Sequence, residues 1–166
     1  MPSVILIADE ALTLDEYAHV WEAVCRCVRQ GSTADLMGLF SSFVRPLDIK
    51  PFFSKAGLPW EGRTYVRTTL TINRAATGDE LAARLPPSYS QKAVFIKNVA
   101  HSDRWYTTDA SSVVEPRVFG PSPAHNPGQS PVIMARVGMG RLGYVGDCNA
   151  EEETDAVILA MCGLLG

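Results

Sequence analysis

The side chains best suited to chemistry in this chain lie in three short stretches, each beside an expected strand end. The stretches are Asp9-Glu10, Ser41-Ser42 and Asp147-Cys148-Asn149. They provide carboxylates, hydroxyls, an amide and a thiol, which suit the hydroxyl groups of a sugar or polyol. Ligands of open α/β sheets bind beyond the carboxyl ends of parallel strands. We therefore predict a ligand site built from Asp9, Glu10, Ser41, Ser42, Asp147 and Asn149. Helix caps and turns use the same residue types, so a purely structural role stays open.

A catalytic nucleophile is the second hypothesis for these stretches. The segment "MGLFSSF" (37–43) resembles the G-x-S-x-G turn of hydrolases, but its serine is one place late and the final glycine is missing. Cys148 begins an expected helix, whose dipole would lower the pKa of the thiol, while the glutamates at 151–153 oppose that effect. His101 is a candidate base for either group. Cys148, His101 and Ser41 are thus the candidates for catalysis, and a structural role for each stays open.

The elements that must position these residues follow from hydrophobic periodicity. An apolar run at 3–9, an amphipathic helix at 13–31 and a strand at 33–41 form a βαβ unit, for which a right-handed crossover is expected. "PVIMARVGMGRLGYVGD" (131–147) predicts an antiparallel hairpin, and a closing helix over 149–165 begins at a capping Asn149. The remaining predicted elements are a short helix at 47–57 broken at Pro51, a strand at 64–73, a helix at 77–86, a strand at 92–99 and a loop-rich segment at 100–130.

Composition excludes several classes of function. The chain of 166 residues is 46% apolar and 20% charged, with a net charge of −3, which fits one domain over 1–166. No Lys/Arg cluster favours nucleic acid or a membrane surface, and no apolar run is long enough to span a bilayer. The apolar run near Met1 is too short for a signal peptide, so we expect a cytoplasmic protein with reduced cysteines. We expect no metal and no cofactor, because "GMGRLG" lies in a hairpin and the cysteine spacing fits no zinc site.

The late hairpin carries the most specific pattern in the sequence. The pattern P-V-x-x-x-R-x-G-x-G-R-x-x-Y-x-G is matched by Pro131, Val132, Arg136, Gly138, Gly140, Arg141, Tyr144 and Gly146. Together with the first strand, the helix ending "VRQGST" and the segment "GLPWEG", it resembles the class I glutamine amidotransferase-like superfamily. Within that superfamily it is similar to the branch of the trehalose-utilisation protein ThuA, especially its fungal members. The resemblance implies an α/β, flavodoxin-like three-layer sandwich, with a mostly parallel sheet and a C-terminal antiparallel hairpin.

Two departures from the family pattern shape the expected function. Amidotransferases carry a cysteine in a G-x-C-x-G turn, whereas "GLFSS" has Phe40 at that position, so glutamine hydrolysis is not expected. The family fold also has a strand-helix unit upstream of the strand at 3–9, and this chain begins directly before that strand. We therefore expect either a shortened member of the family that lacks its first strand-helix unit, or a sheet edge that a second copy or a partner chain completes.

Three functions stay open on these grounds. The leading hypothesis is a small-molecule-binding protein without amidotransferase activity, directed to carbohydrates. The first alternative is a hydrolase or isomerase with its site at the carboxyl ends of the parallel strands. The second is a scaffold or subunit that a partner chain completes.

Overall fold

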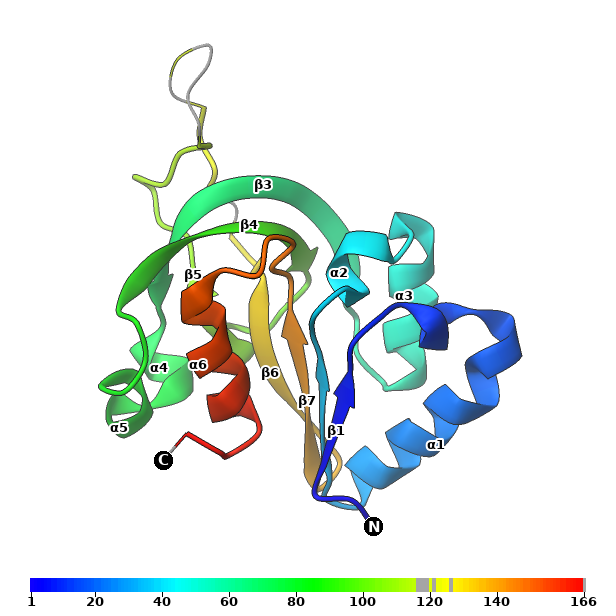
Figure 1. Cartoon of the computed structure of the whole chain (residues 1–166). Helices are drawn as coiled ribbons and strands as arrows, with labels where there is room; N and C mark the ends of the chain where they lie inside the picture. The colour runs from blue at the N-terminus through cyan, green and yellow to red at the C-terminus, as the bar shows by residue number, and fades with distance from the viewer. Residues whose placement is uncertain (116–119, 121, 126, 166) are drawn as a thin grey trace.

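The strands of this protein form a curled, mixed sheet. The computed structural model describes residues 1–115, 120, 122–125 and 127–165, apart from the side chain of Arg63. Within that part, seven strands lie in the order β1-β2-β7-β6-β5-β3-β4 (Figure 1). The strands are β1 (Val4–Ile7), β2 (Thr33–Leu36), β3 (Glu61–Ile72), β4 (Ser88–Lys97), β5 (Arg104–Thr107), β6 (Val132–Val137) and β7 (Gly140–Val145).

The prediction of a flavodoxin-like, mostly parallel three-layer sandwich is wrong. Among the strands of the described residues, only the pairings β1–β2 and β2–β7 are parallel, and the other four pairings are antiparallel. A parallel return from β3 to β4 would need a crossover, usually a long helix. The connection holds only α4 (Arg74–Thr77) and α5 (Asp79–Ala82), of four residues each, and the two long strands pair antiparallel. The βαβ unit at the N-terminus and the late antiparallel hairpin are as predicted.

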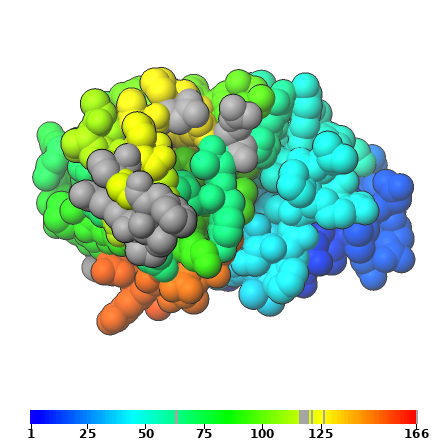
Figure 2. All heavy atoms as spheres, turned by 90° about the horizontal axis from the view of Figure 1, so that it is seen from above, coloured from blue at the N-terminus to red at the C-terminus, as the bar shows by residue number. Residues whose placement is uncertain are grey.

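The long β3–β4 pair arches over one end of the sheet and turns it into a half-barrel (Figure 1). Ala93 and Ile96 of β4 form isolated antiparallel bridges to Asp147 and Ser130, which follow β7 and precede β6. The Val94 N–H donates to the carbonyl of Gly146 at 2.9 Å. Figure 2 looks down on this end, where the green β3–β4 region separates the yellow segment after β5 from the cyan α2–α3 segment. The curl thus brings β4 against the end of β7, although the two are far apart in the sheet order.

The two faces of the sheet carry separate hydrophobic cores. One face is covered by α1 (Ala18–Arg29) and α3 (Pro46–Lys55), and the other by α6 (Glu152–Met161) together with α4 and α5 (Figure 1). The buried apolar residues of α1 recur at helical spacing, and Trp21 stacks on Phe52 of α3 with ring centroids 4.0 Å apart. The indole of Trp21 also donates to the Phe52 carbonyl at 3.0 Å, so its buried N–H is satisfied.

Several local predictions need correction. The first helix begins at Ala18, because the residues before it form the short 3-10 turns η1 (Ala11–Thr13) and η2 (Asp15–Tyr17). Pro51 lies inside α3 and does not break it. The strand predicted over 33–41 ends at Leu36 and is followed by α2 (Phe40–Phe43), and η3 (His101–Asp103) precedes β5. None of the described helices combines the length and apolar composition that a bilayer crossing requires.

Candidate functional site

The carboxyl ends of β2 and β7 lie side by side because these strands pair in parallel. Their two following turns therefore meet. The hydroxyl of Ser41, in α2, lies 3.2 Å from the carbonyl oxygen of Asp147 and 3.6 Å from the sulfur of Cys148. Two of the three stretches that were predicted to converge thus do so.

A pocket of about 420 Å³ opens between these turns and the first half of α6. That volume falls in the range of small-molecule sites. Met37, Leu39, Val145 and Ile158 give the wall apolar surface. The other lining residues are Gly38, Ser42, Asp147, Cys148, Asn149, Ala150, Glu151, Thr154 and Asp155. Of the six residues predicted to bind a ligand, Ser42, Asp147 and Asn149 line it.

The Asp9 and Glu10 side chains are not among the pocket's lining residues. The carboxylate of Asp9 instead accepts the N–H of Ala11 at 3.0 Å, which closes a local turn. The end of β1 reaches the neighbouring turn through its backbone, since the carbonyl of Ala8 accepts the N–H of Leu39 at 2.7 Å. The predicted contribution of Asp9 and Glu10 to this pocket is therefore not supported by the geometry.

The turn after β2 has Gly38 at the first glycine of the nucleophile-turn pattern and the unreactive Phe40 at the nucleophile position. Gly38 has a φ of 62°, and a Cβ at this position would lie 3.0 Å from the carbonyl oxygen of Ala8. This left-handed backbone and the close approach both favour glycine. Phe40 is fully buried among Phe52, Phe53 and Tyr144. Ser41 is also buried, so only Ser42 of the two serines faces the pocket.

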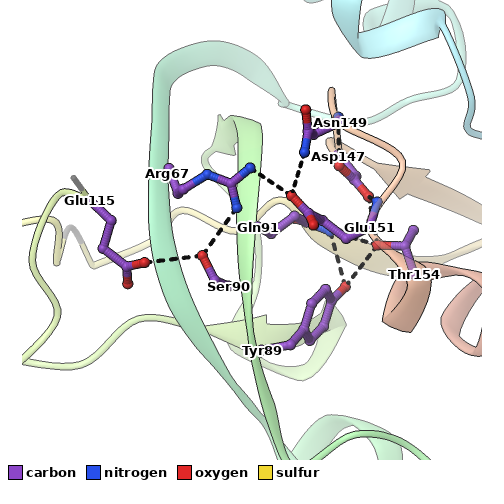
Figure 3. Close-up of polar contacts among 9 residues, drawn as sticks. All are labelled: Arg67, Tyr89, Ser90, Gln91, Glu115, Asp147, Asn149, Glu151 and Thr154. Carbon is purple, nitrogen blue, oxygen red and sulfur yellow. Dashed lines mark hydrogen bonds and ion pairs between the residues drawn. The ribbon is translucent and has the colours of Figure 1, made fainter.

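The carboxylate of Asp147 anchors the start of α6. It accepts the N–H of Asn149 and the N–H of Glu151, each at 2.8 Å, and the hydroxyl of Thr154 at 2.7 Å (Figure 3). Asp147 is 5% exposed. Asp147 therefore holds the turn that leads into α6. The helix begins only at Glu152 with Glu151 in the N-cap position and no side-chain cap, so the capping predicted for Asn149 is wrong.

A polar network joins this helix start to the β3–β4 arch, and nothing in the sequence pattern pointed to it. Arg67 of β3 donates to Glu151 at 2.7 Å and to the hydroxyl of Ser90 at 3.2 Å (Figure 3). Ser90 in turn donates to Glu115 at 3.1 Å. Burial alone would raise the pKa of Glu151, but hydrogen bonds from Arg67 and Asn149 and the Arg67 charge lower it below its usual range. Glu151 is therefore held as a carboxylate at the pocket rim.

A second part of this network is buried. Gln91 of β4 donates to the hydroxyl of Tyr89 at 3.0 Å, and Tyr89 lies 3.4 Å from the Thr154 hydroxyl (Figure 3). Burial raises the pKa of Tyr89, which stays a neutral phenol. These contacts fix Thr154, which holds Asp147 and lines the pocket.

The candidate catalytic residues are not assembled into a nucleophile-base pair. The Cys148 thiol donates to the carbonyl of Gly146 at 3.3 Å. His101 belongs to η3, and its carbonyl accepts the side-chain amide of Asn73. His125 pairs with the Thr108 hydroxyl at 3.0 Å. In the part of the chain that the structure describes, no histidine lines the pocket, and no three His, Cys, Asp or Glu side chains are placed to hold a metal ion.

Comparison with known proteins does not identify the chain. No protein-family model matches it, and no curated protein matches it. The resemblance to the glutamine amidotransferase-like superfamily stays a prediction, and the fold that it implied is not the observed one.

Proposed function

We propose that this protein binds a small, neutral, hydroxylated molecule, of the sugar or polyol class, in the pocket between α6 and the turn after β2. The observation that carries this proposal is the pocket itself, which has a volume of about 420 Å³, lies at the adjoining carboxyl ends of two parallel strands and is lined by both apolar and polar side chains. Sites of this size and composition hold small organic ligands.

The lining chemistry disfavours anionic ligands. Among the described lining residues, the charged side chains are the acids Asp147, Glu151 and Asp155, and none is basic. An anionic ligand would meet repulsion there. Hydroxyl groups can instead donate to carboxylates and to the Asn149 amide oxygen, while C–H surface packs on Met37 and Ile158.

The polar side chains that line the pocket are ordered before a ligand binds. Glu151 is oriented by Arg67 and Asn149, and Thr154 by Asp147 and the buried Tyr89–Gln91 pair. A ligand that uses these groups would lose little further conformational entropy in ordering them. This arrangement supports binding more directly than it supports turnover.

The alternative of a hydrolase or isomerase has less support. A cysteine nucleophile needs a base or an electropositive setting. The Cys148 thiol has the Gly146 carbonyl and the Ser41 hydroxyl as neighbours, and acids line the same pocket. Labelling with iodoacetamide at neutral pH separates the two functions. Selective, fast alkylation of Cys148 would favour the enzyme, and a rate like that of a free thiol would favour binding.

The binding test is a calorimetric and thermal-shift screen of sugars, polyols, amines and phosphates. A ligand at about one hundred times its dissociation constant adds about 2.7 kcal/mol to the free energy of unfolding. We expect the stabilising compounds to be neutral and hydroxylated. Ser42→Ala and Asp155→Asn, both exposed lining residues, should weaken binding.

Matched controls lie outside the pocket. Ser54→Ala on α3 and Asp15→Asn on η2 make the same chemical changes at exposed positions and should bind as the parent does. Equal loss in the pocket variants and the controls would contradict the site. If no compound stabilises the folded protein, the proposed function is contradicted. That result would favour the alternative of a subunit that assembles with a partner chain at the edge strand β1.

A further inference from the structure

A second hollow, of about 250 Å³, lies between the β6–β7 hairpin and the α4–α5 segment. It shares no lining residue with the pocket proposed above. Its lining includes Leu81, Asp103, Trp105, Met134, Arg136 and Arg141. Two of these, Arg136 and Arg141, belong to the hairpin pattern seen in the sequence.

The hairpin register sets the two arginines side by side. Arg136 of β6 and Arg141 of β7 are direct partners in the antiparallel pairing. Their neighbours Met134 and Val145 belong to the core on the α6 side of the sheet, so alternation points both arginines to that same face. Side chains at directly opposed positions stand about 5 Å apart at Cβ.

No acid in the described residues neutralises this pair. The ion pairs there use five other basic residues, Arg45, Lys50, Arg67, Arg74 and Lys97. Asp103, the acid in the hollow, has Ser102 as its side-chain partner. Burial raises the pKa of Asp103, the Ser102 hydrogen bond lowers it, and no arginine contributes. Both arginines are exposed, and an anion between them would be attracted by two positive charges.

We infer that this hollow binds a phosphate monoester, with Arg136 and Arg141 on the phosphate. Two guanidinium forks match a dianion in charge, and each fork can donate two parallel hydrogen bonds to its oxygens. The Thr77 hydroxyl also lines the hollow, but it donates to the carbonyl of Asn73, so the phosphate contacts assigned here are those of the two arginines. The side chains of Leu81, Trp105 and Met134 give an apolar wall against which the organic part of the ester packs.

The test is isothermal titration of the whole chain with phenyl phosphate. Inorganic phosphate, benzoate and benzyl alcohol serve as comparison ligands. We expect saturable binding of phenyl phosphate, weaker binding of inorganic phosphate and benzoate, and none of the alcohol. Arg136→Gln and Arg141→Gln should each weaken phenyl phosphate binding about tenfold or more, as loss of a charged hydrogen-bond pair does.

Arg26→Gln is the matched control, because Arg26 is exposed on α1 and lies outside this hollow. It should bind phenyl phosphate as the parent does. The hairpin variants should unfold at the parent temperature, because both arginines are exposed and take part in none of the ion pairs of the described residues, so lost binding would not reflect lost folding. The inference is overturned by absence of saturable binding to the parent. It is equally overturned if the control loses as much affinity as the hairpin variants.

Discussion

At the scale of single residues, the least expected group is Asp35. It lies on β2 under α6, fully buried, and neither carboxylate oxygen has a hydrogen-bond partner among the described residues. A Cβ on Gly143 would fall 2.6 Å from one of its oxygens, so the glycine leaves the room that the carboxyl occupies. Burial raises the pKa of Asp35 to about 7. The Asp35 carboxyl is therefore neutral in the pH range where it costs the folded state least.

Asp35 predicts that stability falls as the pH rises. Its folded pKa lies above the unfolded value, so the folded state holds the extra proton between about pH 4 and pH 7. The free energy of unfolding should therefore fall by about 3 kcal/mol between pH 5 and pH 8. Two of these three pH units lie below the folded pKa, and each contributes about 1.4 kcal/mol. Urea unfolding at both pH values measures it.

Asp35→Asn should remove most of that pH dependence, because the amide does not titrate. Asp15→Asn, an exposed acid on η2, is the control and should keep the parental decline. Identical pH dependence in Asp35→Asn and the parent would show that Asp35 is not the group responsible.

At the scale of elements, α6 depends on one carboxylate for its placement. Asp147→Ala would leave two backbone N–H groups and the Thr154 hydroxyl without their acceptor. Hydrogen bonds to charged groups contribute about 1.5–3 kcal/mol each, in part additively, so we expect a loss of about 3 kcal/mol in the free energy of unfolding. Guanidinium denaturation measures the loss. Asp155→Ala, exposed on the same helix, should change stability by less than about 0.5 kcal/mol. Equal effects would mean that the hydrogen bonds of Asp147 in the turn before α6 are not what is being measured.

The packing of the β6–β7 hairpin against α1 depends on the absence of a side chain at Gly140. A Cβ there would lie 2.1 Å from the Ser32 carbonyl oxygen and 2.2 Å from that of Val28. Backbone atoms cannot give way cheaply, so Gly140→Ala should cost about 3 kcal/mol by thermal unfolding. Gly62→Ala is the control, because the nearest atom there is the flexible tip of Ile49. It should cost about 1 kcal/mol, and a reversed order would contradict the backbone contact.

At the scale of the whole molecule, the Arg67–Glu151 pair ties the β3–β4 arch to α6. Arg67→Gln should lower the free energy of unfolding by about 1 kcal/mol near pH 7, since the pair is only partly buried. The pKa of Glu151 is lowered in the folded state, so this stabilisation is present above the ordinary pKa of glutamate and is lost as the pH falls through the lowered value. Unfolding of both proteins at pH 7 and pH 3 tests the sign.

The control for that pair is Arg74→Gln, which removes the exposed ion pair with Asp79. Exposed pairs contribute little, so this variant should match the parent at both pH values. A pH-independent loss in Arg67→Gln would assign its effect to packing of the arginine stem instead of to the charge.

The sequence predicted local structure well where a strong period decides it. The apolar spacing of α1, the "GMG" hairpin and the first βαβ unit are all present. The meeting of Ser41 with Asp147 followed from the general rule that parallel strand ends share an edge. The family resemblance, by contrast, led to a mostly parallel sheet that the structure does not have.

Element type and local periodicity were thus determined by the sequence itself, because they depend on neighbours within a few residues. Tertiary structure alone decided three features. They are the antiparallel pairing of β3 with β4, the bridge between Ala93 and Asp147, and the hydrogen bond from Arg67 to Glu151. These contacts join residues far apart in the chain, and no short pattern encodes which distant partner satisfies a buried polar group. The same reason hid Asp35, which the sequence placed inside the strand predicted over 33–41 without showing that a helix would bury its carboxyl.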